Sequence, residues 1–470
     1  MATANRGNFY EHLDRFGDQF AVLLSDGSIV SYSQLHNCVQ EFRRRLPATR
    51  VLGCLLCRNN LAVLVAYLAC LQSGLPVILL PDGMYGQLLQ KLLEVYRPSF
   101  LIKADGTVEL YDRLVQNSDD NFSCGAMHAE LAIMLSTSGS TGSPKQVMLS
   151  YRNLQSNAGA IVEYLGLDAS EKAITTLPFH YSYGLSVVNS HLSVGATLIL
   201  NNDSVISRAF WQLFDATRPT SMAGVPHTYE MLQKLRFHQR DLGSLRYMTQ
   251  AGGKLSADVL TWFAKVLGQK QIRFFVMYGQ TEATARMAYL GPGDVAAHAD
   301  SIGRPIPGGS FELHDPDGKL LTEPGERGEL IYRGANVMLG YARSRQDLLA
   351  LNPPEYLATG DLAYADNDGR FYVCGRKDRT IKVFGHRIDL DEFQGWLQTQ
   401  GWPVICAGET DRVVIAVIQK EQNADVQVLL KHLADRLPFS MKAVSVILLP
   451  EEPKTDNGKI AYGELLRLVA

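Results

Sequence analysis

The 470-residue chain lacks several features that would assign it to common protein classes. Its 45 Lys and Arg residues are scattered and nearly balance its 48 Asp and Glu residues, so no global field favours nucleic acid or an anionic membrane surface. Residues 1–10 lack the apolar core of a secretory signal. The most apolar stretch, Leu61–Pro81, is divided by Gln72, Gly74 and Pro76 into pieces too short to cross a bilayer. We therefore expect no nucleic-acid partner and no membrane-spanning helix.

The seven cysteines form no recognisable metal or redox pattern. Cys54 and Cys57 make a single CxxC, but neither a second such pair nor a nearby pair of histidines completes a metal site. Their apolar neighbours favour a buried strand, in which free cysteine packs as a small hydrophobic residue. This cysteine usage predicts a reduced, cytoplasmic protein.

Apolar runs typical of buried strands alternate with longer helical segments. The runs Leu131–Leu135, Ala196–Leu200 and Arg273–Met277 each end in a polar loop. The segment that begins at Leu61 predicts a buried helix, a stop at a glycine and then a buried strand at Val77–Leu80. Because 470 residues exceed what one hydrophobic core accommodates, this alternation predicts several α/β layers.

The composition changes after about Ile302, where turn-forming residues separate short strands. Farther on, strands are predicted within Pro403–Gln419 and at Val444–Leu449, with a helix at Val426–Leu437. The fold class predicted is α/β, with a large N-terminal domain of layered α/β subdomains plus a β-rich subdomain, and a small C-terminal α/β domain.

The loop STSGSTGSPKQ, from Ser136 to Gln146, follows a predicted buried strand. Its glycines let backbone N–H groups converge on an anion, its hydroxyls add donors and Lys145 adds a positive charge, so the loop suits phosphate. It does not match the phosphate loop of nucleotide kinases, which needs Gly-Lys-Ser/Thr, because Ser143 and Pro144 follow Gly142. A solvated linker is the alternative interpretation of the loop by itself.

Further motifs follow this loop along the chain. Six blocks, in order, read STSGSTGSPKQVMLSYRNL, LPFHYSYGLSV, MAGVPHTYEML, AGGKLS with MYGQTEA, YLATGDLAYADNDGRFYVCGRKDRTIKVFGHRIDLDEF, and PKTDNGKIAYGEL. Together they resemble the signature motifs of the adenylate-forming superfamily, which includes acyl-CoA synthetases, aryl-acid ligases, peptide-synthetase adenylation domains and luciferase. The sequence departs from the family pattern at Gln146, where glycine is usual, which adds a side chain beside the phosphate loop.

The resemblance implies a reaction and two domains. A carboxylate attacks the α-phosphorus of ATP, pyrophosphate leaves, and the acyl group of the acyl-adenylate is transferred to a thiol. Both reactants are anionic, so catalysis must neutralise charge and hold them together. The implied domains are residues 1–376, with the ATP and carboxylate sites, and residues 377–470, a mobile domain with the catalytic lysine.

The family motifs assign roles to individual residues. Glu282 would ligate Mg²⁺, Thr281 would donate to the α-phosphate, Tyr278 would stack on adenine and Asp361 would bind the ribose hydroxyls. The complete implied ATP site is Thr137, Ser138, Gly139, Ser140, Thr141, Gly142, Lys145, Ala251, Gly252, Tyr278, Gly279, Gln280, Thr281, Asp361, Arg376 and Lys459.

The C-terminal motifs imply a two-step mechanism. Lys459 matches the lysine that the family brings to the carboxylate and the α-phosphate. Asp378 matches the hinge about which the small domain rotates, and Gly385 would leave room for a pantetheine arm. Lys459, Thr281, Glu282 and His180 are the predicted catalytic residues.

The predicted acid pocket disfavours amino acids. Members that activate them usually carry an Asp where this chain has His180, and an unpaired buried ammonium would be unfavourable. Small residues beside aromatic ones suit a flat ring or a medium acyl chain. The implied lining is His180, Tyr183, Gly224, Val225, Gln250, Ala251, Gly252 and Gln280.

The sequence leaves alternatives open for the thiol acceptor and for the class of function. Free CoA is favoured slightly over the phosphopantetheine of an acyl carrier protein. A catalytically silent binding protein would lack Lys459, Glu282 or Asp361, and all three are present. No sequence feature separates a ligase from a luciferase-like oxygenase that uses the same adenylation step.

Overall fold

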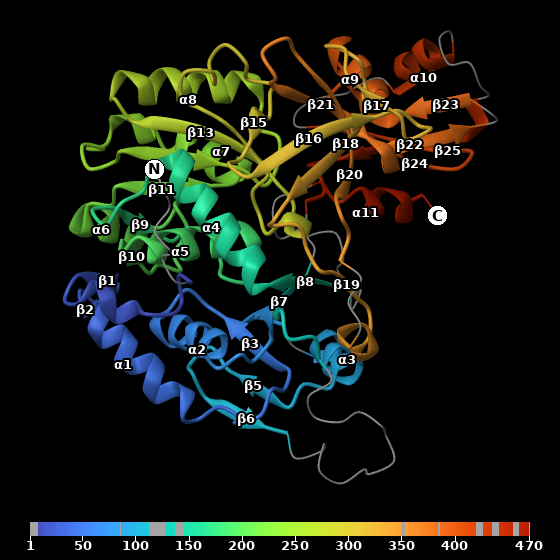
Figure 1. Cartoon of the computed structure of the whole chain (residues 1–470). Helices are drawn as coiled ribbons and strands as arrows, with labels where there is room; N and C mark the ends of the chain where they lie inside the picture. The colour runs from blue at the N-terminus through green and yellow to red at the C-terminus, as the bar shows by residue number, and fades with distance from the viewer. Residues whose placement is uncertain are drawn as a thin grey trace. The chain divides into compact units, whose positions relative to one another are not determined.

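The computed structural model describes two compact units (Figure 1). The first comprises Met1–Phe311 and Tyr332–Leu357, and the second comprises Glu312–Ile331 and Ala358–Ala470. The described residues are 8–84, 86–111, 127–136, 145–349, 353–383, 386–419, 426–434, 441–454 and 460–469.

The first unit contains a nine-stranded sheet in the order β15-β14-β13-β12-β11-β9-β10-β1-β2. The strands from β13 to β1 in this order run parallel, whereas β14, β15 and β2 are antiparallel to their neighbours. The predicted strands at Ala196–Leu200 and Arg273–Met277 are confirmed as β10 and β13. The strands are β1 (Phe20–Leu23), β2 (Ile29–Ser31), β9 (Lys172–Ile174), β10 (Thr197–Ile199), β11 (Ser221–Gly224), β12 (Tyr247–Gln250), β13 (Arg273–Tyr278), β14 (Ala288–Leu290) and β15 (Arg304–Pro305).

A second sheet of seven strands has the order β19-β8-β7-β4-β3-β5-β6. The predicted helix, glycine stop and strand are confirmed as α2 (Leu61–Gln72), Gly74 with a φ of +67°, and β4 (Val77–Pro81). The strand predicted at Leu131–Leu135 is β7 (Leu131–Ser136). The others are β3 (Gly53–Cys57), β5 (Phe100–Ile102), β6 (Val108–Leu110), β8 (Gln146–Ser150) and β19 (Gly340–Ala342).

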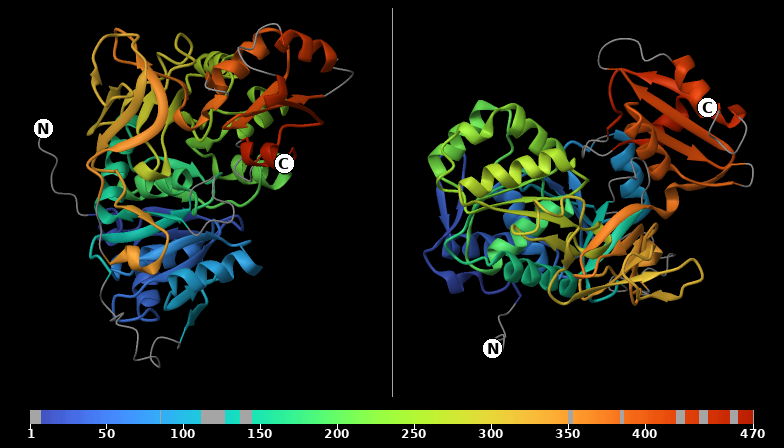
Figure 2. Two further views of the ribbon diagram at one scale, coloured as in Figure 1. Left: turned by 90° about the vertical axis from the view of Figure 1, so that its right-hand side faces the viewer. Right: turned by 90° about the horizontal axis from the view of Figure 1, so that it is seen from above.

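Helices cover both faces of these sheets, as Figure 2 also shows. Between the sheets lie α1 (Tyr32–Arg43), α2, α4 (Tyr151–Leu165) and α5 (Ser182–Ser193), whose side chains share one core with both sheets. The outer face of the nine-stranded sheet carries α6 (Arg208–Thr217), α7 (Pro226–Lys234) and α8 (Ala257–Gln269), and α3 (Gly86–Tyr96) packs on the other sheet.

Strand β3 shows why this arrangement follows from the sequence. Leu55 and Cys57 face the central core, and Cys54 and Leu56 face the opposite side, so both faces of the strand are buried. Such strands are continuously apolar because helices cover both sides of a parallel sheet. Burial raises the pKa of both cysteine thiols, as expected for packed cysteines. Among the described residues, no group of three His, Cys, Asp or Glu side chains could hold a metal.

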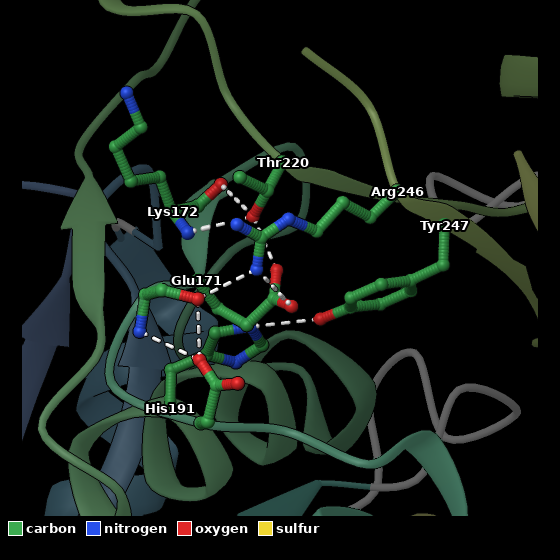
Figure 3. A network of polar contacts seen from close by, with 8 residues as sticks. Glu171, Lys172, His191, Thr220, Arg246 and Tyr247 are labelled. Carbon is green, nitrogen blue, oxygen red and sulfur yellow. Dashed lines mark hydrogen bonds and ion pairs between the residues drawn. The ribbon is translucent and has the colours of Figure 1, made fainter.

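A buried polar network joins α5 to the nine-stranded sheet (Figure 3). On α5, His191 Nδ1 donates to the carbonyl of Val187 at 2.8 Å, and its Nε2 accepts from the hydroxyl of Tyr247 on β12 at 2.9 Å. Beside them, the buried carboxylate of Glu171 accepts from Arg246 at 3.1 Å. These bonds satisfy polar groups that could not otherwise be buried without a large cost.

The second unit contains mainly antiparallel strands and three helices within its described residues. A five-stranded sheet, β17-β16-β18-β20-β21, confirms the β-rich region predicted after about Ile302. Its strands are β16 (Gly309–His314), β17 (Leu320–Leu321), β18 (Gly328–Gly334), β20 (Leu357–Ala365) and β21 (Phe371–Arg376); the ends of β16, β18 and β20 extend into the first unit. A two-stranded sheet, β22 (Thr380–Val383) with β23 (His386–Asp389), follows.

The last part of the second unit is a small α/β layer. The predicted strands are confirmed as β24 (Val404–Glu409), β25 (Arg412–Ile418) and β26 (Val444–Leu449). Alternate residues of these strands pack against α9 (Leu390–Thr399) and α10 (Val426–Ala434) on one face and α11 (Tyr462–Arg467) on the other. The predicted helix Val426–Leu437 is α10, and residues 435–437 lie outside the described part. The domain boundary between residues 376 and 377 stays a prediction.

Candidate active site

Several predicted site residues of the first unit lie at or just after the carboxyl ends of strands in the nine-stranded sheet. Strands β9, β11, β12 and β13 are parallel, so their carboxyl ends lie on the same side. Gly224 at the end of β11 pairs in register with Gln250 at the end of β12, which pairs with Val276 on β13. The carboxyl edge of a parallel sheet is where α/β proteins commonly bind ligands.

Two tyrosines of this edge are fixed by one residue. The hydroxyl of Tyr183 donates to the carbonyl of Thr249 at 2.9 Å and lies 2.8 Å from its Oγ1. The hydroxyl of Tyr229 donates to the same carbonyl at 2.8 Å. These bonds fix the positions of both hydroxyls, and the Tyr229 ring lies beside Gly224, where an added Cβ would come within 2.8 Å of it.

A third tyrosine, Tyr181, was not among the predicted site residues. An added Cβ at Gly252 would lie 2.5 Å from the Tyr181 hydroxyl oxygen and 3.1 Å from Cγ1 of Val225, and the φ of Gly252 is +88°. Tyr181 lies edge-on to Tyr183, with ring centroids 6.3 Å apart. Within the part of the chain that the structure describes, its hydroxyl makes no hydrogen bond. Tyr181, Val225 and Gly252 thus form one wall that contains an unused donor.

His180 precedes this tyrosine at the start of α5. Its side chain is mostly buried, and its Nδ1 is shielded from solvent and has no hydrogen-bond partner among the described residues. Burial lowers the pKa of His180 to about 4, so the ring is neutral at pH 7. A neutral imidazole cannot supply a counter-charge, but its Nδ1 can still exchange a hydrogen bond with a ligand.

The segment after β13 presents Thr281 and Glu282 in a short 3₁₀ turn, Thr281–Ala283. Oγ1 of Thr281 lies 3.3 Å from Oγ of Ser182 at the start of α5. The Oε1 atom of Glu282 accepts from the hydroxyl of Tyr341 at 2.9 Å, and no described cation pairs with this carboxylate. One carboxylate with a second oxygen available fits Mg²⁺, which usually takes one or two carboxylates with phosphate oxygens and waters.

The neighbouring residues around β13 form the predicted adenine region. The ring of Tyr278 packs against Phe311 at a centroid distance of 6.4 Å, and Gln280 Nε2 lies 3.5 Å from its hydroxyl. Gly279 has no room for a side chain, because an added Cβ would lie 1.6 Å from the carbonyl oxygen of Ala285. Ala251 bonds through its N–H to the carbonyl of Gly224 at 3.2 Å.

The phosphate-loop predictions fall largely outside the described residues. Thr137, Ser138, Gly139, Ser140, Thr141 and Gly142 lie there. Of the flanking residues, Lys145 places Nζ 3.5 Å from the centroid of the Tyr341 ring.

Gln146, the departure from the family pattern, is the fully buried first residue of β8. It pairs in register with Ser136 on β7, and their side chains hydrogen-bond at 3.0 Å. The additional side chain is therefore accommodated within the sheet.

In the second unit, two predicted nucleotide residues form an ion pair. Asp361 on β20 and Arg376 on β21 are register partners, and Nη1 of Arg376 lies 3.1 Å from Oδ1 of the buried Asp361. Asp378 lies in the 3₁₀ turn Lys377–Arg379. Gly385 and Lys459 lie outside the described residues.

Comparison with known proteins gives the family. A family model described as AMP-binding enzyme matches residues 9–342. The chain belongs to this family. The match includes the first-unit site residues Lys145, His180 and Glu282.

Curated relatives of this family member are acid–thiol ligases by name. The chain is 30% identical to an indoleacetate–CoA ligase of Aromatoleum aromaticum over 344 residues, covering 71% of this chain and 66% of the relative. It is 27% identical to a D-alanine–D-alanyl carrier protein ligase of Bacillus licheniformis over 435 residues, covering 84% of this chain and 85% of the relative. A long-chain-fatty-acid–CoA ligase of Bacillus subtilis is matched over 61% of its length, so the chain spans less than two thirds of some relatives.

Solved structures show the same fold. The o-succinylbenzoate CoA synthetase of Bacillus subtilis, in complex with its acyl-adenylate intermediate, superposes with a TM-score of 0.78 at 21% identity, covering 97% of each chain. The complex of that enzyme with ATP and magnesium gives a TM-score of 0.77 at 21% identity, covering 98% of this chain and 99% of the other. The predicted α/β fold with a large N-terminal and a smaller C-terminal domain is therefore confirmed.

Proposed function

We propose that this AMP-binding family member activates a carboxylic acid with ATP, releases pyrophosphate and transfers the acyl group of the acyl-adenylate to a thiol. The observation that carries the proposal is the arrangement at the carboxyl edge of the nine-stranded sheet. Thr281 and Glu282 follow β13 there, beside the start of α5, and Tyr341 contacts both Glu282 and Lys145. Tyr341 thus contacts both a positive charge and a carboxylate that could ligate a metal. This pair of groups is suited to binding a triphosphate and its metal ion.

The chain's own residues divide the work of the first step. Lys145 would bind phosphate, and the hydroxyl of Thr281 would donate to a phosphate oxygen. Glu282 would hold Mg²⁺, which when bound neutralises phosphate charge. Lys459 would contact the acid carboxylate and the α-phosphate. These groups hold two anions in contact, and this positioning is a large part of catalysis in such reactions.

Several of the predicted residues would bind the nucleoside. Tyr278, Gly279 and Ala251 would form the adenine site in the first unit. Asp361 in the second unit would accept from the ribose hydroxyls. Asp361 pairs with Arg376 at 3.1 Å, and its carboxylate oxygens can accept hydrogen bonds from hydroxyl groups.

The pocket favours an uncharged acyl or aryl group over an α-amino acid. His180 stands where amino-acid-activating members usually carry an Asp, and its neutral ring gives an ammonium group no negative charge to pair with. The rest of the proposed acid pocket is largely apolar and is lined by Tyr183, Gly224, Val225 and Gly252. The name of the indoleacetate–CoA ligase supports an aryl acid, whereas the name of the D-alanyl carrier protein ligase supports a small one.

CoA is the proposed acceptor, and the phosphopantetheine of an acyl carrier protein is the second candidate. The named CoA ligases among the relatives favour the first, and the carrier protein ligase, matched over most of its length, favours the second. Rotation about Asp378 and passage of the thiol beside Gly385 are part of this proposal. A cytoplasmic location also belongs to it; the described residues include no helix with the length and apolarity needed to span a bilayer.

A pyrophosphate-release screen over aryl, short-chain, medium-chain and amino acids tests the first step. We expect an aryl or acyl acid to give the strongest signal, with Glu282→Gln lowering it by at least tenfold. The best acid is then incubated with CoA and, separately, with a phosphopantetheinylated carrier protein. A strong preference for an α-amino acid would refute the pocket assignment, and full activity of Glu282→Gln would refute the metal assignment.

A further inference from the structure

The turn that follows Glu282 has an unusual backbone conformation. Thr284 has a φ of +59° and Ala285 a φ of +106°, although neither is glycine. Residues with a Cβ rarely occupy this region, and they remain there only where surrounding contacts enforce it. The carbonyl of Ala285 also packs directly on Gly279. Contacts from elsewhere in the chain must therefore hold this turn.

One buried side chain, Asn336, binds both ends of the turn. Its Nδ2 donates to the carbonyl of Ala283 at 2.8 Å and to the carbonyl of Arg286 at 3.1 Å. Its backbone carbonyl accepts from Oγ1 of Thr284 at 2.7 Å. Asn336 is 3% exposed, so water cannot replace these bonds readily.

Asn336 is itself fixed on the opposite side. Its Oδ1 accepts from the hydroxyl of Tyr332 at 2.9 Å. On α4, Asn153 Nδ2 donates to the carbonyls of Ala335 at 2.8 Å and Val337 at 2.7 Å, which flank Asn336. The amide orientation is therefore defined, because its oxygen faces a donor and its nitrogen faces two acceptors.

The same loop also contacts Glu282 directly. The N–H of Met338 donates to the carbonyl of Glu282 at 2.8 Å, and the hydroxyl of Tyr341 donates to its carboxylate at 2.9 Å. Residues 336–341 thus contact the main chain and the side chain of Glu282 and the turn behind it. These residues are more than 50 positions away in sequence.

We propose that Asn336 is a positioning residue for Glu282. It holds the turn 283–286 in its strained conformation, and that conformation determines where the Glu282 carboxylate lies. This inference rests on the proposed role of Glu282 as the Mg²⁺ ligand. Groups that orient a metal ligand commonly change metal affinity by about 10- to 100-fold when removed.

The test measures Mg²⁺-dependent ATP binding by calorimetry, together with thermal unfolding and without turnover. We expect Asn336→Ala to raise the Mg²⁺ concentration for half-maximal ATP binding by about tenfold. Acid binding should change less than twofold in the same protein. An unchanged Mg²⁺ requirement with a lowered melting temperature would overturn the proposal and leave Asn336 a purely structural residue.

A matched control separates positioning from general packing. Asn157 on α4 donates to the same Arg286 carbonyl at 2.9 Å, but among the described residues it makes no hydrogen bond to Ala283 or Thr284. We expect Asn157→Ala to lower the melting temperature while the Mg²⁺ requirement stays within twofold of the original protein. Equal Mg²⁺ shifts in Asn157→Ala and Asn336→Ala would overturn the specific role of Asn336.

A second substitution tests the link to backbone strain. Glycine adopts the φ of Ala285 without a steric penalty, so Ala285→Gly should make the turn less dependent on Asn336. We expect the double variant Asn336→Ala with Ala285→Gly to recover at least half of the lost Mg²⁺ affinity on a logarithmic scale. No recovery would contradict the strain argument.

Two further variants keep the test decisive. If Asn336→Ala fails to fold, Tyr332→Phe removes only the bond to Oδ1 of Asn336 and should give a smaller Mg²⁺ shift in the same direction; no shift would overturn the proposal. Glu282→Gln measures the metal role itself. If that variant binds ATP with the original Mg²⁺ dependence, the proposed function of Glu282 fails. If it shifts and the Asn336 variants do not, only the present inference fails.

Discussion

Lys145 lies above the ring of Tyr341, with Nζ 3.5 Å from the ring centroid. The hydroxyl of the same ring donates to Glu282 at 2.9 Å. One tyrosine therefore contacts a predicted phosphate-binding cation and the predicted metal-ligand carboxylate. Tyr341 therefore keeps the ammonium group of Lys145 and the carboxylate of Glu282 close to the same ring.

Graded substitutions of Tyr341 separate these two contacts. Tyr341→Phe keeps the ring below Lys145 but removes the bond to Glu282, and a hydrogen bond to a charged group contributes about 1.5–3 kcal/mol. We expect an increase of about tenfold or more in the Mg²⁺ requirement. Tyr341→Leu also removes the cation–π contact, which contributes about 0.5–1 kcal/mol at an accessible site, and should weaken ATP binding further. Calorimetry with and without Mg²⁺ measures both effects, and identical behaviour of the two variants would exclude a role for the ring contact.

Tyr181 should limit the size of the acid. Tyr181→Ala removes the wall beside Gly252, so the preferred acid in a pyrophosphate-exchange series should become longer or bulkier. Tyr181→Phe removes only the hydroxyl, which bonds to none of the described residues, and should chiefly weaken acids that carry a hydrogen-bond acceptor. Tyr229→Phe is the control: it loses the bond to the Thr249 carbonyl and should cost about 1 kcal/mol of stability without a change of preferred acid. An unchanged size preference in Tyr181→Ala would refute the assignment.

Gly252→Ala should have the opposite effect to Tyr181→Ala. The added Cβ would collide with the Tyr181 hydroxyl, and the φ of +88° is unfavourable for alanine. We expect Gly252→Ala to lose acid binding. The double variant with Tyr181→Ala should partly restore it, because it removes the collision but not the unfavourable φ. The KM for the acid reports this rescue, and an acid KM in Gly252→Ala equal to that of the original protein would show that this wall is not part of the pocket.

Because His191 is buried, we expect the free energy of unfolding to fall in mild acid. Burial lowers its pKa to about 4, and the positive charge of Arg286 disfavours protonation further, whereas an unfolded histidine titrates near 6.5. Between these values the unfolded chain binds the proton and the folded chain does not, so the free energy of unfolding falls as the pH drops from about 6.5 to about 4. The loss from this residue is about 3 kcal/mol. Urea unfolding at several pH values measures it, and His191→Gln should flatten the slope; an unchanged slope would assign the effect to other groups, such as His180.

Lys459→Ala should abolish pyrophosphate release with the best acid, by about 10²-fold or more, because a preorganised positive charge is lost. The circular dichroism spectrum and melting temperature should match those of the original protein. Lys454→Ala is a control, since this lysine lies near Lys459 in sequence and forms an ion pair with Glu452 at 3.2 Å. Full activity of Lys459→Ala would remove this residue from the mechanism.

The sequence by itself determined the alternation of strands and helices, the site motifs and the family resemblance. Continuously apolar strands such as β3 and β7, and glycine stops such as Gly74, follow local rules of burial and backbone freedom. The motif residues of β11, β12 and β13 were predictable for the same reason, since they end strands in loops of small residues. Only the tertiary structure could reveal Tyr341 and Asn336, because they are not adjacent to Glu282 in the chain and no periodicity links them.

Tyr181 and Gln146 are visible in sequence motifs, but tertiary contacts decide what each of them does. Tyr181 lies within a recognised motif, but its role depends on the close approach of Gly252, which only the packing of α5 against β12 brings about. Gln146 stood out in the sequence as a departure at the phosphate loop, and strand pairing with Ser136 decided that its side chain is accommodated in the sheet. Local sequence thus sets which elements form and which chemical groups are available, whereas contacts across long sequence separations decide which of those groups meet.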